Sequence, residues 1–84
     1  MDNIRIYPTP TSDFIFLHFS TAQLLEQVEI SILNIVGQTI TNKQYGTLIG
    51  PQQFSFDLSK QRSGMYWVVL RSEQGVSSWK VVKN

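Results

Sequence analysis

Turn signals recur about every ten residues along this chain of 84 residues, a spacing typical of short strands in a β-sandwich or barrel. The segments between the turns are rich in β-branched and aromatic residues, whereas alanine occurs only at Ala22. Such side chains pack well on pleated sheets and lose rotamer freedom in helices. We therefore expect an all-β fold, in a single domain over residues 1–84 because a chain of this length supports one modest core.

Seven segments show the alternation of a strand: residues 4–7, 14–19, 28–33, 38–45, 54–59, 65–70 and 76–83. Three of them have a wholly apolar face, which predicts the core: Ile15, Leu17 and Phe19; Val28, Ile30 and Ile32; Phe54, Phe56 and Leu58. Pro8 and Pro10 lack the amide hydrogen that a ladder needs, so the first segment is expected at an edge. The weak pattern of 38–45 predicts an edge strand anchored by Ile40, and the apolar segment 65–70 predicts a central strand.

Two stretches between these segments are expected outside the sheet. Residues 20–27 have the one helix-compatible pattern, with Ser20 and Gln23 spaced as a capping box, but they are too few for an independent helix. We expect one helical turn there, or a loop that plugs the end of the core. Residues 46–51 contain two glycines and a proline, which predicts a mobile loop.

The composition argues against several classes of protein. A net charge of +1 gives no basic field, so we expect no nucleic-acid partner. Without cysteine there is no disulfide, thiolate nucleophile or cysteine metal site. No apolar run approaches the roughly 20 residues that span a bilayer, so we expect no transmembrane segment. The chain also opens without a signal peptide, which leaves open whether Met1 is the native first residue and places any export signal on preceding sequence.

The chain contains no recognisable catalytic constellation. His18 is the only imidazole, and it lies on a predicted strand between aromatic neighbours, where a partly exposed packing role is expected. Asp57 and Glu73 belong to no carboxylate pair with a recognisable spacing and are expected to be solvated charges. We therefore predict a protein that is not an enzyme and that has no catalytic, metal or cofactor-binding residues.

Short motifs distributed along the whole chain resemble a known family. They are Tyr7-Pro8-Thr9-Pro10, Ile32-Leu33-Asn34-Ile35-Val36-Gly37-Gln38, Asp57-Leu58-Ser59 followed by Ser63-Gly64-Met65-Tyr66, and Lys80-Val81-Val82-Lys83. In order and spacing the chain resembles the C-terminal sorting domain of the type IX secretion system. One departure is visible, because Thr9 stands where the family usually has Asn between the two prolines.

The resemblance implies an immunoglobulin-like antiparallel β-sandwich that forms the C-terminal part of a larger exported protein. Such a domain is a secretion signal and not an enzyme. Its implied partners are a fused N-terminal cargo domain, the outer-membrane type IX translocon and a sortase-like peptidase that commonly removes the domain. The implied location is the periplasm in transit, and then the cell surface or the medium.

Translocon recognition is expected at the motif residues, which are Pro8, Pro10, Gly37, Gly64, Lys80, Val81, Val82 and Lys83. The prolines are expected to stiffen a junction with the upstream cargo, and the glycines suit backbone positions that side chains would strain. Lys80 and Lys83 are three residues apart and should point to opposite faces of a strand. Alternatively, the backbone edge of the last strand docks by strand addition, with Val81 and Val82 giving affinity.

A second functional hypothesis is a carbohydrate-binding or adhesion β-sandwich module. Trp67 and Trp79, with Arg71 and Lys80 beside them, offer aromatic rings that could stack on sugars. Tryptophan more often packs in a core or on a sheet face, so the secretion signal is the leading hypothesis.

Overall fold

The computed structural model describes residues 2–84, so Met1 lies outside it. Five strands form this part of the chain: β1 (Asp2–Tyr7), β2 (Phe14–Asn34), β3 (Thr39–Asp57), β4 (Gly64–Ser72) and β5 (Gly75–Lys83). All of them pair antiparallel in one sheet, in the order β1-β2-β4-β5, with β3 also paired to β2. The prediction of an all-β antiparallel fold is confirmed, and the predicted number of seven strands is wrong.

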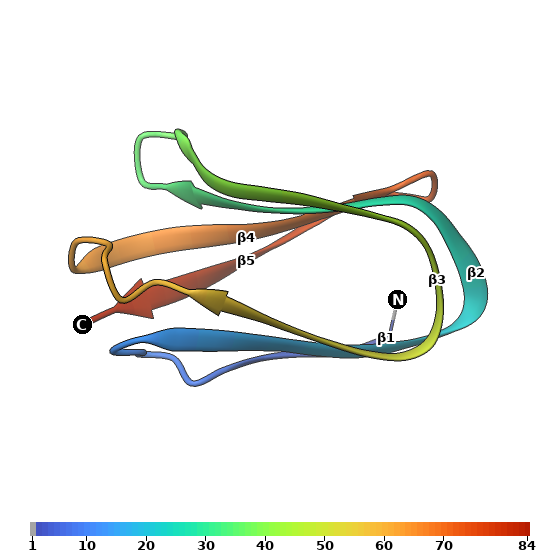
Figure 1. The fold of residues 1–84 in the computed structure, drawn as a ribbon, viewed down its shortest axis with the longest axis horizontal. Coiled ribbons are helices and arrows are strands. Elements are labelled where there is room, and N and C mark those ends of the chain that lie inside the picture. The colour runs from blue at the N-terminus through green and yellow to red at the C-terminus, as the bar shows by residue number, and fades with distance from the viewer. Residues whose placement is uncertain (1) are drawn as a thin grey trace.

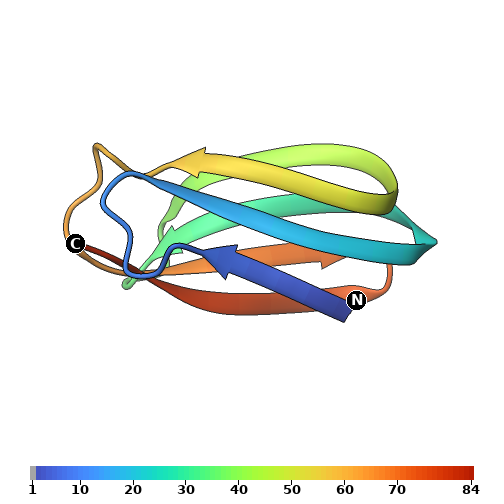
Figure 2. The same cartoon turned by 90° about the horizontal axis from the view of Figure 1, so that it is seen from below.

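The two long strands β2 and β3 fold the sheet into two layers. They pair with each other almost from end to end, from Phe14 opposite Asp57 to Leu33 opposite Thr39. Midway both strands curve round together, so that each contributes to both layers (Figure 1). The first half of β2 pairs with β1 and its second half pairs with β4, which in turn pairs with β5. The two layers face each other as in a β-sandwich (Figure 2).

The curve explains why the strand count was wrong. Residues 20–27, expected as a helical turn or a loop, belong to β2, where Thr21 pairs with Gly50 and Leu25 with Leu48. The register shifts several times here, and Gln27 has a positive φ of 57°. Such irregularities increase the local bend of a strand. Residues 20–27 are extended because β3 supplies hydrogen-bonding partners for their backbone. A run this short is not stable as an independent helix, in which it would bond to its own backbone.

Residues 46–51, expected as a mobile loop, form the matching bend of β3. Gly46 pairs with Val28 and Pro51 with Ser20, so both ends of this stretch belong to the ladder. The composition that indicates a loop is also the composition of a sharply curved strand, because glycines and irregular pairing occur where strands turn corners. The prediction of a loop here is therefore wrong.

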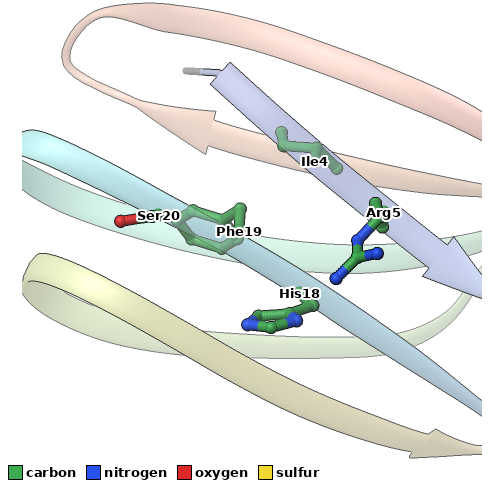
Figure 3. A pocket seen from close by; sticks show the side chains of 5 residues that line it. All are labelled: Ile4, Arg5, His18, Phe19 and Ser20. Atoms are coloured by element: carbon green, nitrogen blue, oxygen red, sulfur yellow. The ribbon is translucent and has the colours of Figure 1, made fainter.

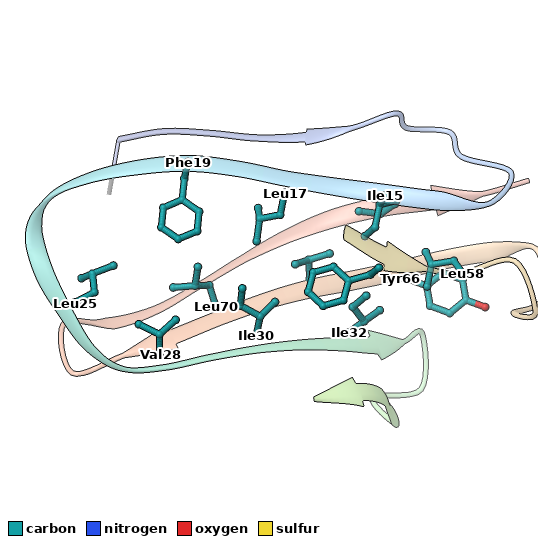
Figure 4. Close-up of a cluster of buried hydrophobic side chains, with 13 residues drawn as sticks. Ile15, Leu17, Phe19, Leu25, Val28, Ile30, Ile32, Leu58, Tyr66 and Leu70 are labelled. Atoms are coloured by element: carbon teal, nitrogen blue, oxygen red, sulfur yellow. The ribbon is translucent and has the colours of Figure 1, made fainter. Parts of the chain in front are cut away.

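The core lies between the two layers. Its buried apolar side chains are Ile15, Leu17, Phe19, Leu25, Val28, Ile30, Ile32, Phe56, Leu58, Tyr66, Val68, Leu70 and Val81. In Figure 4, the side chains from the first half of β2 point toward those from its second half and from β4. Full burial of one such side chain contributes about 1.5–3 kcal/mol. Eight of the nine predicted core residues are buried, and Phe54 is half-buried against the cluster.

The predicted strand positions agree with the observed order. β1 and β5 are the ends of the path and β4 lies between β2 and β5, so the first segment is an edge strand and residues 65–70 are central. Ile40 is half-buried against the core and anchors the start of β3. β1 begins at the end of the molecule opposite the C-terminal residue (Figure 2).

Two leucines of β2 allow a matched test of this packing. Leu17 is 0% exposed and Leu24 is 49% exposed. We expect Leu17→Ala to lower the free energy of unfolding by about 2–5 kcal/mol, because it removes transfer energy and leaves a cavity. Leu24→Ala should change it by less than about 0.5 kcal/mol. Urea denaturation of both variants measures the difference, and equal losses would contradict the core described above.

Candidate functional site

Three connections and the end of β5 meet at one end of the molecule, which we call the motif end. The connections are residues 8–13, 34–38 and 58–63, and in both views they lie at the same end of the molecule as the C-terminal residue (Figures 1 and 2). Strand pairing ties them together, since Gly64 is opposite Lys83 and Lys83 also bridges to Thr11. The eight residues expected to contact the translocon, spread over most of the sequence, therefore lie at or near the motif end.

Hydrogen bonds clasp the segment 8–13 to the last residues of β5. The Thr11 amide donates to the Val82 carbonyl at 2.9 Å, and the Asn84 amide donates to the Thr11 carbonyl at 2.8 Å. The Val82 amide donates to Oγ1 of Thr9 at 3.2 Å. Thr11 is buried, and its own hydroxyl donates to the Phe14 carbonyl at 2.6 Å. Sequence reasoning identified the prolines and the last strand but not this contact between them.

The clasp changes the expected role of Pro8 and Pro10. They were expected to stiffen a junction with upstream cargo, but β1 is a paired strand that begins at the opposite end of the molecule. The prolines are exposed and lie within the fold, between β1 and β2. Thr9, which departs from the family's usual Asn, supplies a hydroxyl acceptor to β5. An Asn side-chain oxygen is also an acceptor, so this departure preserves the hydrogen-bonding type.

The clasp also bears on strand addition at β5. Both backbone groups of Val82 are engaged by residues 9–11, so this part of the edge is already covered. Lys80 is exposed, whereas Lys83 is buried and its Nζ donates to the Asn84 carbonyl at 3.0 Å. The two lysines therefore point to opposite faces of β5, as their spacing predicts. Val81 is buried in the core and Val82 is half-buried.

The side chain of Asn34 organises the β2–β3 connection. Its Oδ1 accepts hydrogen bonds from the amides of Val36 at 3.1 Å and Gln38 at 2.9 Å, and its Nδ2 donates to Oε1 of Gln38 at 2.9 Å. Gly37 has a φ of 88°, a conformation that strains other residues, and no atom lies where its Cβ would be. Gly37 is therefore required by its backbone conformation, as the sequence predicts, and not by a close contact. The sequence motif did not single out Asn34 as a residue that organises the turn. Asparagine is nevertheless a common turn residue, because its side chain forms hydrogen bonds with nearby backbone groups.

The β3–β4 connection is fixed by side chains at both of its ends. Oδ1 of Asp57 accepts from the Ser59 amide at 2.8 Å, and the Tyr66 hydroxyl donates to the Arg62 carbonyl at 2.6 Å. Hydrogen bonds from Ser59 lower the pKa of the exposed Asp57 carboxyl, and the charge of Lys60 adds to this effect. Gly64, the first residue of β4, has a φ of 148°, which again disfavours a side chain.

The other candidate residues lie apart from one another. Trp67 is exposed and pairs with Lys80, whereas Trp79 packs against the core and pairs with Val68. The two rings are on opposite faces of the sheet and do not form one stacking platform for a sugar. Oε2 of Glu73, in the turn after β4, accepts a hydrogen bond from the Glu26 amide at 2.6 Å. Asp57 is the last residue of β3, before a different connection, so the two carboxylates do not form a pair.

His18 lies in a pocket of about 600 Å³ on the strands β1 and β2, where it pairs with Arg5 (Figure 3). Ile4, Phe19 and Ser20 complete the lining, so no carboxylate accompanies the imidazole. Among the side chains of residues 4–84, no group of three or more His, Cys, Asp or Glu residues is arranged to hold a metal ion. The same part of the chain contains no helix with the length and apolar character needed to cross a membrane.

The sequence matches the secretion system C-terminal sorting domain family over residues 5–84. The chain belongs to this family. The match covers both the clasped proline segment and the last strand, and it confirms the resemblance to the C-terminal sorting domain of the type IX secretion system. No curated protein matches the sequence. The sorting domain is thus a type IX secretion signal whose family motifs are gathered at one end of the fold.

Thr9 provides a test of the clasp. Thr9→Val removes the acceptor for the Val82 amide and keeps the shape of the side chain, which should cost about 1 kcal/mol and reduce the protection of that amide roughly fivefold. Thr9→Asn restores an acceptor and should retain more of the protection. Amide hydrogen exchange followed by NMR measures both, with the Val68 amide in β4 as an internal reference. Unchanged protection in Thr9→Val would refute the role assigned to the hydroxyl.

Asp57 predicts a dependence of stability on pH. Its pKa is lower in the folded state than in the unfolded chain, so its charge stabilises the fold above the unfolded pKa near 4, and this contribution is lost as the pH falls through the folded value. Asp57→Asn keeps an oxygen acceptor for Ser59 but removes the charge. Its melting temperature should therefore lie below that of the unmodified domain at pH 7, and the two should converge as the pH falls through the folded pKa of Asp57. If the difference between the two melting temperatures stayed constant across this pH range, the Asp57 charge would not be the source of the stabilisation.

Proposed function

We propose that this chain is a non-catalytic C-terminal signal that directs a fused cargo across the outer membrane through the type IX translocon, with the motif end as the surface that the translocon reads. The cargo precedes β1. After passage, a sortase-like peptidase removes the domain, and the cargo is attached to the cell surface or released.

The observation that carries this proposal is the gathering of the family motifs at one end of the molecule. The residues that define the resemblance come from the beginning, middle and end of the chain, yet they lie at one end of the molecule. Lys83 bridges to Thr11 and is opposite Gly64, and Asn34 of the middle motif pairs with Tyr66 of β4. Some motif residues serve the fold itself, as Val81 and Gly37 do. Exposed motif residues such as Pro8 and Lys80 add a surface at the same end that another protein can read.

The placement of β1 supports the same proposal. Asp2 begins β1 at the end of the molecule opposite the motif end (Figure 2). A cargo attached ahead of β1 would therefore leave the motif end uncovered. Cleavage that releases the cargo is expected before β1 and not at the prolines, because the segment 8–13 is held to β5 by hydrogen bonds.

The candidate residues divide into three groups by exposure and backbone conformation. Pro8, Pro10 and Lys80 are exposed and Val82 is half-buried, so these side chains are available to the translocon. Val81 and Lys83 are buried and act by fixing the position of β5. Gly37 and Gly64 act through their backbone conformations. Recognition and stability thus use different residues at the same end.

Export of a reporter tests the proposal. Residues 1–84 are fused after a periplasmic fluorescent reporter in a host that has the type IX translocon, and the reporter is quantified in periplasm, surface and medium. We expect export with the domain and retention without it. Lys80→Ala should reduce export about tenfold, the effect of one lost charged contact, with the melting temperature unchanged.

Lys43→Ala is the matched control, because Lys43 is also an exposed lysine on a strand. It should leave export unchanged. Retention of the unmodified fusion in the periplasm would overturn the proposal, whereas equal effects of the two lysine variants would remove Lys80 from the recognition surface.

A further inference from the structure

The tip of the β2–β3 connection exposes two adjacent apolar side chains. Ile35 is 68% exposed and Val36 is 74% exposed, the highest values among the large apolar side chains that the structure describes as exposed. Tight connections usually carry Gly, Asn, Asp, Ser or Pro. Single exposed apolar residues are common on protein surfaces, but a paired tip at the most prominent position of a hairpin is typical of an interaction site.

This tip is held rigid by its own hydrogen bonds. Asn34 binds the amides of Val36 and Gln38 through one oxygen, and the Asn34 amide donates to the Gln38 carbonyl at 2.9 Å. The Gly37 amide closes the turn on the Asn34 carbonyl at 3.0 Å. A loop fixed in this way loses little conformational entropy when a partner binds. The structure therefore presents Ile35 and Val36 in a preorganised position.

A groove of about 550 Å³ lies between this tip and the start of β4. Its walls combine apolar side chains, among them Ile40 and Met65, with the cations Lys60 and Arg62, and no carboxylate lines it. The charge of Lys60 is partly directed at Asp57, whereas Arg62 has no ion-pair partner among the side chains that the structure describes, those of residues 4–84. The groove thus has both apolar and polar walls, and its rim is positive, with Lys60 partly compensated by Asp57 and Arg62 uncompensated.

We propose that the tip and this groove, as part of the signal proposed above, form the docking site for a receptor segment that combines apolar and acidic side chains. Its apolar side chains cover Ile35 and Val36, and its carboxylates face Arg62 and Lys60. Complementary charge favours encounter and register at such interfaces. The proposal rests on the proposed function and names the chemistry of the receptor.

Two other occupants fit the groove less well. A second copy that docked through the same surface would bring its own Lys60 and Arg62 into the interface and would supply no carboxylate from that surface, so like charges would be brought close together. An anionic lipid surface is typically recognised by clusters of four to eight basic residues, and only two line this groove. A protein segment with carboxylates is the occupant that matches both the apolar tip and its charge.

Paired substitutions at the tip test the proposal in the reporter assay. Ile35→Ser with Val36→Ser should reduce export roughly tenfold or more, because the apolar contact is lost. The control is Ile49→Ser with Val76→Ser, which are 56% and 59% exposed and lie away from the motif end. The control should be exported like the unmodified domain. Thermal melting should place both pairs within about 2 °C of it, since neither pair is in the core.

Charge at the tip supplies a second, independent readout. Val36→Asp and Val36→Lys remove the same apolar side chain and add opposite charges. Against an acidic receptor segment, Val36→Asp should be exported several-fold less than Val36→Lys. The purified variants should show the same order in binding to outer-membrane vesicles from translocon-containing cells, with vesicles from translocon-deleted cells as the blank, and added salt should reduce the difference.

The outcomes separate this inference from the function on which it rests. If the unmodified domain is not exported, the proposed function fails and the docking site fails with it. If the unmodified domain is exported and the serine pair is exported equally well, only the docking site is refuted. Equal losses in the two serine pairs would also refute it, because export would then depend on exposed apolar surface in general. Better export of Val36→Asp than of Val36→Lys would refute the acidic receptor.

Discussion

The pairing of β2 with β3 through a shared bend is the constraint on which the rest of the structure depends. A two-stranded ribbon has an open end, where β2 begins and β3 ends, and a closed end at the hairpin of residues 34–38. Folding the ribbon in half brings these two ends together (Figure 1). The segments 8–13 and 58–63 continue from the open end, and so they meet the hairpin at the motif end. The site is therefore a geometric consequence of the bend.

Burial of one apolar face identified most of this fold from the sequence. The alternation around Leu17, Ile30 and Phe56 follows from the period of a pleated strand, and the structure buries all three. The pattern did not predict that β2 and β3 each continue as one strand through residues 20–27 and 46–51. The first stretch has a helix-compatible pattern and the second has the composition of a loop, and only pairing between β2 and β3 makes them strands. A local pattern cannot contain that information, because the partner residues are distant in the sequence, as for Thr21 and Gly50.

The candidate site shows the same division between local and distant information. The positive φ of Gly37 and the opposite directions of Lys80 and Lys83 follow from single residues and their spacing, and the structure agrees with both. The clasp does not follow in this way, because Thr9 and Val82 are separated by 73 positions. Thr11 carried no signal in the sequence beyond its place next to Pro10. Its burial and its three hydrogen bonds make it the centre of the clasp.

A signal that is read at the end of a small domain must be both fixed and accessible. At the motif end these two requirements fall on alternate residues of β5, because the pleat sends Val81 and Lys83 inward and Lys80 outward. Loss of an inward residue would disturb recognition only by moving the strand, so a loss of export there cannot by itself identify a contact. An outward residue such as Lys80 or Val36 can be changed while the core and the clasp stay intact. The alternation of a single strand thus decides which substitutions report on the translocon and which report on the fold.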